Sequence, residues 1–307
     1  MKIVLLDALT FGETDLSAFD SLGEVEVFQT TSADEVQKRI TNCDVIVTNK
    51  VVITDINMQN TPTLKLICVA ATGMNNVDLN AAKERNIEVK NVAGYSTDSV
   101  IQHTFSMLFY LMGHSRYYDE SVKDGTYSRS PIFTDVSHPY FEIKGKKWGM
   151  IGLGSIGRGV ADIAKAFGAE VSYYSTSGRN RDENYRRTTL DELLKSCDII
   201  TIHAPLNEQT NNLLDYERLL TCKDGATVLN LGRGGIINEE AVAKIIDEKN
   251  ISFGLDVLTA EPMQENHPLL SVKNIDNLYI TPHIAWASVE ARDKLIASVI
   301  ENIKSIS

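Results

Sequence analysis

The sequence of 307 residues has little of what marks several classes of protein. It contains four cysteines, none in a C-x-x-C pair, and each lies in or beside an apolar run: Cys43, Cys68, Cys197 and Cys222. This pattern favours buried free thiols over disulfides or metal ligands. No apolar stretch approaches the roughly 18 residues of a membrane-spanning helix, and the N-terminal strand pattern meets Asp7 too early for a signal peptide. We therefore expect no membrane association and a cytoplasmic protein.

Positive charge is also scarce. Lys and Arg together number 30 against 41 Asp and Glu, which gives a formal net charge of −11. This balance argues against a nucleic-acid or anionic-membrane partner, because both attract basic surfaces. The six histidines show no metal-ligand spacing such as H-E-x-x-H, so we expect no metal site. One of them, His103, lies in an apolar stretch and is expected to be a packed, hydrogen-bonded residue.

What the sequence does contain is a regular alternation of strand-like and helical segments, over a length that favours two domains. In the first hundred residues the strand-like runs are KIVLLD (2–7), EVEVF (24–28), CDVIVTN (43–49), LKLICVAA (64–71) and IEVKNV (87–92). A second series comprises KWGMIGLG (147–154), EVSYYS (170–175), CDIITIHAP (197–205), GATVLNLG (225–232), ISFGLDVL (251–258) and LYITPH (278–283). Nearly all-apolar strands that alternate with helices are typical of a parallel sheet covered on both faces.

The helical segments complete this pattern. The stretch 32–40 opens with Ser32 and carries Glu35 three positions later, which predicts a capping box. A polar helix is expected at 80–86, and a long helix at 98–117 that is apolar nearly all round and therefore buried between domains or subunits. Residues 118–145 are polar and irregular, and an amphipathic helix is expected within 284–307. The sequence thus predicts an α/β protein of two doubly wound parallel-sheet domains.

One turn of the second series carries a ligand-binding signature. IGLGSIG (151–157) places Gly152, Gly154 and Gly157 in a G-x-G-x-x-G pattern between a strand and a helix. The first glycine permits the tight turn, the second lets the backbone approach a pyrophosphate, and the third lets helix pack on strand. The phosphates would lie against the backbone N–H groups of Ser155 and Ile156 at the helix N-terminus.

Polar residues follow several strands of the second series, at the edge where ligands of open parallel sheets bind. They are His203, Asn230, Arg233, Asp256, Glu261 and His283. Each alone is as readily a cap or a satisfied surface group. Six at one sheet edge favour a site.

With these motifs in place, the chain resembles the D-isomer-specific 2-hydroxyacid dehydrogenase family over essentially its whole length. The resemblance rests on ATGMNNVDL (71–79), NVAGYSTDSVIQHTFSML (91–108), IGLGSIG (151–157), HAPL (203–206), NLGRGGIINEEA (230–241), GLDVLTAEP (254–262) and TPHIAWAS (281–288). It implies a flavodoxin-like substrate domain from residues 1–97 plus 284–307, a Rossmann NAD(P)-binding domain from 98–283, and a homodimer. TPHIAWAS and GTYSRSPIFTD (125–135) are similar to members that act as glycerate dehydrogenases or hydroxypyruvate reductases.

The resemblance also implies roles for single residues. Arg233, Glu261 and His283 would carry the chemistry, and Asp256 would bind the nicotinamide carboxamide. Thr72, Gly73 and Tyr95, together with Arg233, would bind the substrate. The cofactor would further contact residues of the strand ends: His203, Ala204, Pro205, Leu231 and Gly232.

Elementary chemistry agrees with the three catalytic positions. A 2-oxo acid carries a carboxylate beside a ketone. A guanidinium is a rigid, permanently charged fork that can bind both groups. Reduction places negative charge on the ketone oxygen, so a proton donor is needed, and histidine suits neutral pH. A carboxylate behind the imidazole fixes its orientation and stabilises its charged form.

The cofactor preference depends on a residue type that is missing. NAD-specific sites place an Asp or Glu at the end of the second strand, where it binds the adenosine ribose and repels the 2′-phosphate of NADP. Here the strand runs into Ser175, Thr176 and Ser177, with Arg179 and Arg181 behind them. Hydroxyls and arginines suit a phosphate, although they are equally compatible with an ordinary solvated turn. We expect NAD(P) as the cofactor, with NADP favoured.

Two other functions fit the same fold. One is a corepressor or other NAD-sensing binding module, and the other is formate or phosphite oxidation. The full Arg233, Glu261 and His283 set favours catalysis over the first. The formate branch typically has Gln at the position of Glu261, which makes it the weaker alternative. The leading hypothesis is an oxidoreductase that moves hydride between NAD(P)H and a small 2-oxo or D-2-hydroxy acid.

Overall fold

The computed structural model describes residues 1–179 and 181–306, and the chain forms two compact units. Unit 1 comprises Met1–Ser96 and Ala287–Ser307, and unit 2 comprises Thr97–Trp286. The sequence placed the boundaries at 97/98 and 283/284, within three residues of these positions. Unit 1 is therefore built from both ends of the chain, and unit 2 from its centre.

Unit 1 contains a five-stranded parallel sheet of order β2-β1-β3-β4-β5, the flavodoxin-like order. Its strands are β1 (Lys2–Leu5), β2 (Glu24–Val27), β3 (Val45–Thr48), β4 (Leu66–Val69) and β5 (Glu88–Asn91). All five fall within the runs that the sequence predicted. Every residue of β3 and β4 is buried, because helices cover both faces of the sheet.

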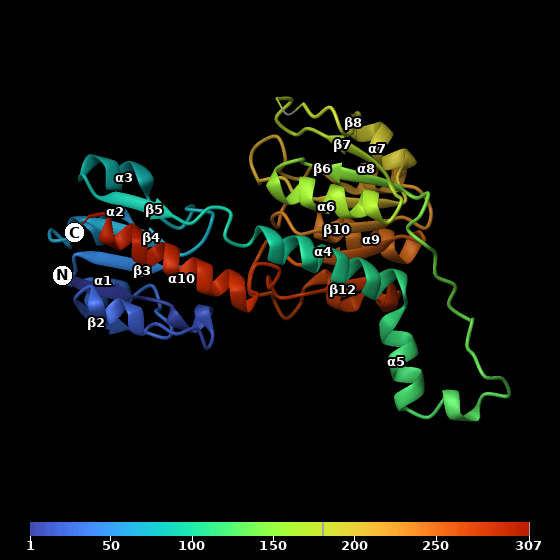
Figure 1. Ribbon diagram of the computed structural model, residues 1–307, viewed down its shortest axis with the longest axis horizontal. Coiled ribbons are helices and arrows are strands. Elements are labelled where there is room, and N and C mark those ends of the chain that lie inside the picture. Colours follow the sequence, from blue (N-terminus) through green and yellow to red (C-terminus); the bar gives the residue numbers. More distant parts are fainter. Residues whose placement is uncertain (180, 307) are drawn as a thin grey trace. The chain divides into compact units, whose positions relative to one another are not determined.

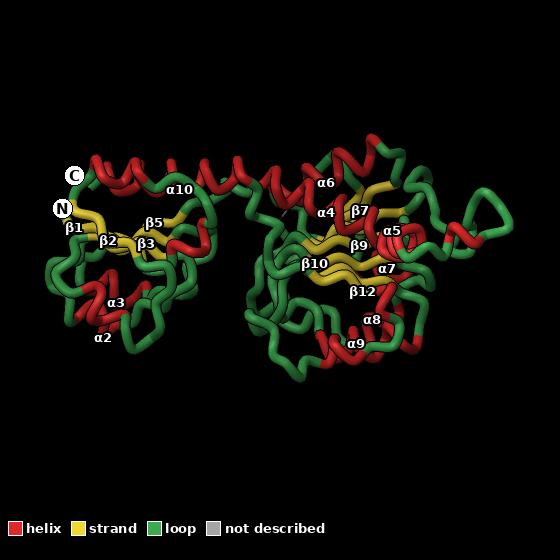
Figure 2. Tube along the Cα trace, turned by 90° about the horizontal axis from the view of Figure 1, so that it is seen from below, coloured by secondary structure: helices red, strands yellow, loops and turns green. Residues whose placement is uncertain are grey.

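The helices of unit 1 are α1 (Val36–Ile40), α2 (Asp55–Gln59), α3 (Leu79–Glu84) and α10 (Val289–Lys304). Apolar side chains of α1, α2 and α3 share one core cluster with residues of β1, β3 and β4. Figure 2 shows α10 along the other face of the same sheet, where it contacts β4. The C-terminal helix thus completes the fold of the N-terminal sheet.

The capping box expected at 32–40 is wrong in part. The carboxylate of Glu35 does accept from the Ser32 backbone N–H, at 2.9 Å. The Ser32 hydroxyl, however, donates to the same carboxylate oxygen, at 2.8 Å, and does not cap α1. Helix α1 begins only at Val36. A complete capping box forms instead at α2, between Thr54 and Asn57.

Unit 2 contains a seven-stranded parallel sheet of order β12-β11-β10-β9-β6-β7-β8, the Rossmann order with one added strand. Its strands are β6 (Lys147–Ile151), β7 (Glu170–Tyr174), β8 (Arg186–Arg187), β9 (Ile199–Ile202), β10 (Thr227–Asn230), β11 (Ser252–Leu255) and β12 (Leu278–Ile280). Six of the seven were predicted. The sequence did not predict β8, a two-residue edge strand beside β7.

Helices cover both faces of this sheet as well (Figure 2). Its helices are α4 (Thr97–Met112), α5 (Ser115–Lys123), α6 (Ser155–Ala166), α7 (Leu190–Ser196), α8 (Tyr216–Thr221) and α9 (Glu239–Glu248). Helices α4 and α6 pack on one face around the fully buried Trp148. Helices α7, α8 and α9 pack on the other face. Short 3₁₀ turns also occur, namely η1 (Ala8–Phe11), η2 (Ser17–Ser21), η3 (Tyr127–Arg129), η4 (Pro268–Ser271) and η5 (Ile275–Asn277).

The single helix expected at 98–117 is two helices. Helix α4 ends at Met112, and α5 begins at Ser115 after a turn in which His114 has a left-handed backbone with φ 48°. The surface of α4 is also less apolar than expected, because Gln102 and Ser106 are exposed. Figure 1 shows α5 and the segment after it extending away from the rest of unit 2.

All four cysteines are free and buried, as the sequence predicted. Burial raises the pKa of the Cys43, Cys68 and Cys222 thiols to about 12, so these thiols stay protonated at neutral pH. Among the described residues, no helix combines the length and apolar character needed to cross a membrane.

One buried carboxylate organises the carboxyl edge of the sheet in unit 1. Asp7 follows β1 and is 6% exposed. Its Oδ2 atom accepts from the backbone N–H groups of Lys50, at 2.7 Å, and Val51, at 3.3 Å. Its Oδ1 atom accepts from Asn49 N at 2.9 Å. The loop after β3 therefore directs three consecutive N–H groups at one side chain.

We predict that Asp7→Ala lowers the free energy of unfolding of unit 1 by about 2–4 kcal/mol, because it leaves buried N–H groups without an acceptor. Urea denaturation and amide hydrogen exchange at residues 45–51 would measure the loss. Asp20→Ala, which removes an exposed carboxylate of the same unit, is the control and should cost less than about 0.5 kcal/mol. Equal stability of the two variants would contradict the prediction.

Candidate active site

The polar residues that follow the strands of unit 2 meet at one edge of its sheet. All its strands are parallel, so their carboxyl ends share that edge. The neighbouring strands β10, β11 and β12 bring Arg233, Asp256 and His283 to it. The glycine-rich turn and His203 follow β6 and β9, the next strands along.

The glycine-rich turn has the shape that the pattern predicts. Gly152 has φ 92°, and a Cβ on it would lie 3.0 Å from the backbone of Ala204. A Cβ on Gly157 would lie 2.4 Å from the Gly152 carbonyl oxygen. A Cβ on Gly154, in contrast, would meet nothing within 4 Å. Two glycines are therefore required by close packing, whereas the third leaves open space before the N–H groups of Ser155 and Ile156, at the start of α6.

The end of β7 carries hydroxyl groups and no acid. Ser175 is buried, and its Oγ atom has no hydrogen-bond partner among the described residues. A turn follows in which Gly178 N donates to the Ser175 carbonyl oxygen at 3.1 Å. Ser177 Oγ accepts from Arg179 N at 3.3 Å, and the Arg179 side chain is exposed. Thr176 is half-buried and Arg181 is exposed, while Asn180 between the arginines lies outside the described residues.

Two further arginines lie near this turn and were not predicted. Arg158, on α6, forms an ion pair with Asp182, whose side chain is 5% exposed. The acid that follows the turn is thus already paired. Arg187, on the edge strand β8, reaches within 3.9 Å of the place where a Cβ on Gly178 would lie. Only the fold brings it there, because nothing in the sequence marks β8.

The imidazole of His203 is shielded at the end of β9. Its backbone N–H donates to Ile151 O at 2.9 Å, which ties it to the glycine-rich turn. Neither ring nitrogen has a hydrogen-bond partner among the described residues. Burial lowers the pKa of His203 to about 3, so the ring is neutral at physiological pH.

The loop after β10 is built around Asn230. The side chain of Asn230 is buried, donates to Arg233 O at 2.9 Å and accepts from Gly232 N at 3.1 Å. Gly232 packs against Ala204, since a Cβ on it would lie 2.8 Å from the Ala204 carbonyl oxygen. Leu231 is buried and Pro205 is exposed. The Arg233 guanidinium is exposed and uses one nitrogen, Nη1, to donate to Gly232 O at 2.8 Å.

His283 and Glu261 form a direct pair. Nδ1 of His283 lies 2.7 Å from Oε2 of Glu261, and both side chains are partly exposed. The other oxygen, Oε1, accepts from Leu258 N at 3.0 Å. The carboxylate is therefore fixed at one oxygen by the backbone and turns the other toward the imidazole.

Asp256 lies behind this pair, buried at 2% exposure. It accepts from the backbone N–H groups of Ile284, at 2.9 Å, and Ala285, at 3.0 Å. It also accepts from Thr281 Oγ1 at 2.6 Å, and Nε2 of His103 lies 3.1 Å from that hydroxyl. His103 is thus hydrogen-bonded, as the sequence predicted, but its neighbourhood was not foreseen.

The residues expected to bind substrate from unit 1 follow β4 and β5, two adjacent strands. Thr72 Oγ1 donates to Val92 O at 3.2 Å, and Thr72 O accepts from Asn91 at 2.6 Å. These bonds join the two loops. Thr72 is exposed, Gly73 is half-buried and Tyr95 is buried.

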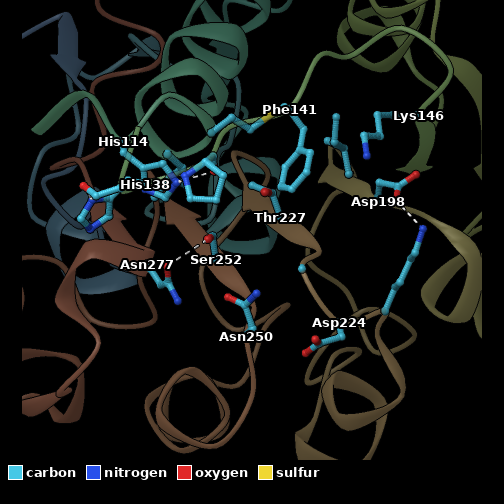
Figure 3. Close-up of a pocket in the computed structure, with 17 residues that line it drawn as sticks. His114, His138, Phe141, Lys146, Asp198, Asp224, Thr227, Asn250, Ser252 and Asn277 are labelled. Carbon is cyan, nitrogen blue, oxygen red and sulfur yellow. Dashed lines mark hydrogen bonds and ion pairs between the residues drawn. The ribbon is translucent and has the colours of Figure 1, made fainter. Parts of the chain in front are cut away.

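A cavity of about 550 Å³ in unit 2 does not coincide with these residues (Figure 3). Asp198, Thr227 and Ser252, which line it, lie at or before the amino ends of β9, β10 and β11. Figure 3 also shows His114 and His138 on its wall. It therefore opens at the sheet edge opposite to the one where Arg233, Asp256 and His283 lie.

Comparison with known protein families gives a match to the central part of the chain. Residues 105–285 match the family model described as D-isomer specific 2-hydroxyacid dehydrogenase, NAD binding domain. That span covers almost all of unit 2 and includes the glycine-rich turn, His203, Arg233, Asp256, Glu261 and His283. Unit 2 thus corresponds to the NAD binding domain of that family.

The whole chain is similar to characterised relatives. It is 35% identical over 312 residues to a hydroxypyruvate reductase of Blautia hydrogenotrophica, with 99% of this chain and 96% of that protein covered. It is 31% identical over 306 residues to a glycerate dehydrogenase of Methylorubrum extorquens, with 99% and 95% covered. Among solved structures it is similar to an acyclic imino acid reductase, Bsp5, in complex with NADPH and D-Arg. The TM-score is 0.86 and the identity 30%, with 100% of this chain and 97% of that chain covered. The chain belongs to the D-isomer specific 2-hydroxyacid dehydrogenase family and is a nicotinamide-dependent oxidoreductase of 2-oxo and 2-hydroxy acids.

Proposed function

We propose that this enzyme reduces a small 2-oxo acid of the hydroxypyruvate or glyoxylate type to the D-2-hydroxy acid, with NADPH as the preferred reductant. The observation that carries the proposal is the His283–Glu261 pair, at 2.7 Å, on the same sheet edge as the exposed Arg233. The substrate type follows the names of the relatives, a hydroxypyruvate reductase and a glycerate dehydrogenase.

His283 is proposed to exchange a proton with the substrate oxygen. Glu261 occupies Nδ1, which leaves Nε2 to protonate the developing alkoxide or, in the reverse direction, to take the hydroxyl proton. Glu261 is already fixed by the backbone of Leu258, so it holds the imidazole in one tautomer and orientation.

Arg233 is proposed to bind the substrate carboxylate and polarise the ketone. Within the part of the chain that the structure describes, only Nη1 of its guanidinium bonds to the protein, toward Gly232 O, so most of its five donors remain for the substrate. A permanent charge suits a group that must hold a carboxylate and also meet charge that develops during reduction. Thr72, Gly73 and Tyr95 stay predictions for the carboxylate-binding loops of unit 1.

The residues of unit 2 fit a nicotinamide dinucleotide. Open space at Gly154 and the N–H groups of Ser155 and Ile156 suit the pyrophosphate. The buried polar atoms of Ser175 and His203 lack hydrogen-bond partners among the described residues, and a bound ligand would supply them. Asp256 is proposed to accept from the nicotinamide carboxamide with its remaining lone pair, beside Ala204, Pro205, Leu231 and Gly232. When bound, the cofactor supplies or accepts the hydride.

The preference for NADPH is proposed from the end of β7. Residues 175–179 offer hydroxyl groups and an arginine and contain no carboxylate that would repel a 2′-phosphate. Asp182 is neutralised by Arg158. Arg179 and Arg187 are exposed and border the turn at Gly178, so either can pair with the phosphate.

The assembly is proposed to be a homodimer. The segment after α5 exposes large apolar side chains: Ile132, Phe133, Val136, Tyr140 and Phe141. Phe133 is 89% exposed, which is unusual for a monomer surface. The cytoplasmic location expected from the sequence stays a prediction.

We predict that His283→Ala lowers kcat about 100- to 10,000-fold, because it removes the proton donor. The Kd for NADPH should stay near the wild-type value. Steady-state kinetics with hydroxypyruvate and glyoxylate, together with fluorescence titration of NADPH, would measure both. His267→Gln is the matched control, since His267 also pairs with a carboxylate, that of Glu239 at 2.9 Å, and its loss should leave kcat nearly unchanged. Full turnover by His283→Ala would refute the proposed role.

The same assay separates the alternatives. Absence of turnover with every 2-oxo acid, combined with tight NADPH binding, would favour a binding module over an enzyme. Turnover that requires an added amine would place the chain with the imino acid reductase to which it is similar.

We predict that the wild-type enzyme uses NADPH with the higher kcat/KM and that Ser175→Asp shifts the preference toward NADH by at least about tenfold, or 1.4 kcal/mol. The carboxylate would accept from the ribose hydroxyls and repel the 2′-phosphate. Arg187→Ala should weaken NADPH alone, whereas Arg186→Ala, which removes an exposed neighbour paired with Glu192, should affect neither cofactor. A wild-type preference for NADH above about tenfold would contradict the assignment.

We predict by light scattering a mass of twice the 34.0 kDa of the chain. Phe133→Asp combined with Phe141→Asp should yield monomers, because it charges the exposed apolar segment. Ile56→Asp, at an equally exposed apolar position of unit 1 (64%), is the control. A wild-type monomer at micromolar concentration would overturn the dimer.

A further inference from the structure

We propose that His103, on helix α4, is a positioning residue of the reaction. Through Thr281 and Asp256 it holds the turn that presents His283. The inference rests on the role proposed above for His283 and adds to it a residue outside the strand-end cluster.

The buried carboxylate of Asp256 is the centre of this turn. Oδ1 accepts from Thr281 Oγ1, at 2.6 Å, and Ile284 N, at 2.9 Å, while Oδ2 accepts from Ala285 N, at 3.0 Å. Two of these donors follow His283 directly, and the third precedes it. A carboxylate that is 2% exposed requires such donors, because it has lost its hydration. Asp256 therefore clamps the chain on both sides of His283.

The hydrogen bonds of Asp256 stabilise an unfavourable backbone conformation at His283. His283 has φ 53°, a left-handed conformation that is unfavourable for a residue with a Cβ and persists only where the surroundings enforce it. The backbone N–H of His283 lies 2.8 Å from Asp256 O and 2.9 Å from Thr281 O. Asp256 and Thr281 thus hold His283 through their main chains, and the side chain of Asp256 holds the residues that follow it.

His103 completes this arrangement by fixing the Thr281 hydroxyl. That hydroxyl has one proton, and Asp256, as a carboxylate, only accepts. The proton therefore points at Asp256, and Thr281 Oγ1 must accept from Nε2 of His103, 3.1 Å away. Nε2 also lies 3.7 Å from Asp256 Oδ1. Burial lowers the pKa of His103, against the opposing effect of the Asp256 charge, which favours the neutral ring with its proton on Nε2.

The side chain at position 103 is proposed to act as a hydrogen-bond donor to Thr281 and not only to fill space. A phenyl ring would fill the same volume but leave the Thr281 hydroxyl free to turn away from Asp256. A glutamine would keep an N–H donor at nearly the position of Nε2. The chemistry of the side chain, and not its bulk, should therefore decide how well His283 is placed.

The experiment compares variants that keep or remove each hydrogen bond between His103, Thr281 and Asp256. The kcat is measured at saturating NADPH and 2-oxo acid, and the melting temperature is measured in parallel. His103→Phe and Thr281→Val should each lower kcat about 10- to 100-fold, the cost of a small misplacement of a reacting group. His103→Gln and Thr281→Ser should retain most of it. Gln102→Ala, an exposed neighbour on α4, should behave as wild type.

The double variant His103→Phe with Thr281→Val tests the connection itself. Both changes break the same series of hydrogen bonds, from His103 through Thr281 to Asp256. The double variant should therefore lose no more kcat than the slower single variant. Three results would each overturn the inference. The first is a double variant whose loss of kcat is the product of the two single losses. The others are a His103→Phe enzyme within twofold of wild type and a His103→Gln enzyme as slow as His103→Phe. Should His103→Phe fail to fold, the Thr281→Val and Thr281→Ser pair provides the same comparison.

These outcomes separate this inference from the proposed function. An active His283→Ala enzyme would overturn the proposed function and this inference with it. An inactive His283→Ala enzyme beside a fully active His103→Phe enzyme would overturn only the role of His103.

Discussion

Parallel pairing of the strands is the constraint on which the rest of the structure depends. Each parallel strand must return through a crossover, so helices cover both faces of both sheets and the strand ends of each sheet share one edge. In unit 2 this edge collects residues that lie far apart in the chain, from Gly152 after β6 to His283 after β12. The loops at the edge lie outside the ladder, however, and their N–H groups need acceptors from elsewhere. How those groups are satisfied decides which side chains the edge can present.

Both sheets solve this problem with a buried carboxylate. Asp7 after β1 accepts from the loop after β3, and Asp256 after β11 accepts from the loop after β12. In each case the acid follows one strand and fixes the loop after its neighbour in the sheet. A carboxylate suits this task because it has about four acceptor positions on one short side chain. The two differ in what the fixed loop carries. The loop at Asp256 carries His283, the proposed proton donor, so the device that fixes a loop in unit 1 would in unit 2 also place a reacting group.

The sequence predicted the elements of the fold better than their interruptions. Buried parallel strands are apolar on both faces, so their runs were visible, whereas β8 consists of two arginines and exists only because it lies beside β7. The break at Gly113 and His114 was missed because a second helix begins directly after it, at Ser115, so helix-compatible residues lie on both sides of the turn. At the candidate site, family motifs identified Arg233, Glu261 and His283 as candidates. The positions of His103 and Arg187 depend on how α4 and β8 pack, which no local pattern encodes.

The meaning of a buried polar atom without a hydrogen-bond partner depends on where the atom lies in the fold. Ser175 Oγ and both ring nitrogens of His203 lack partners among the described residues, but so does Nε of Arg292 in unit 1. The arginine has another nitrogen bonded, Nη1 to Phe11 O at 2.7 Å, and lies within helix α10. A single unpaired atom there is a local cost of packing. Ser175 and His203 instead end strands on either side of β6, the strand that leads into the glycine-rich turn. Unsatisfied groups that converge on a turn with open space at Gly154 have a common explanation, because one ligand along that edge would satisfy all of them.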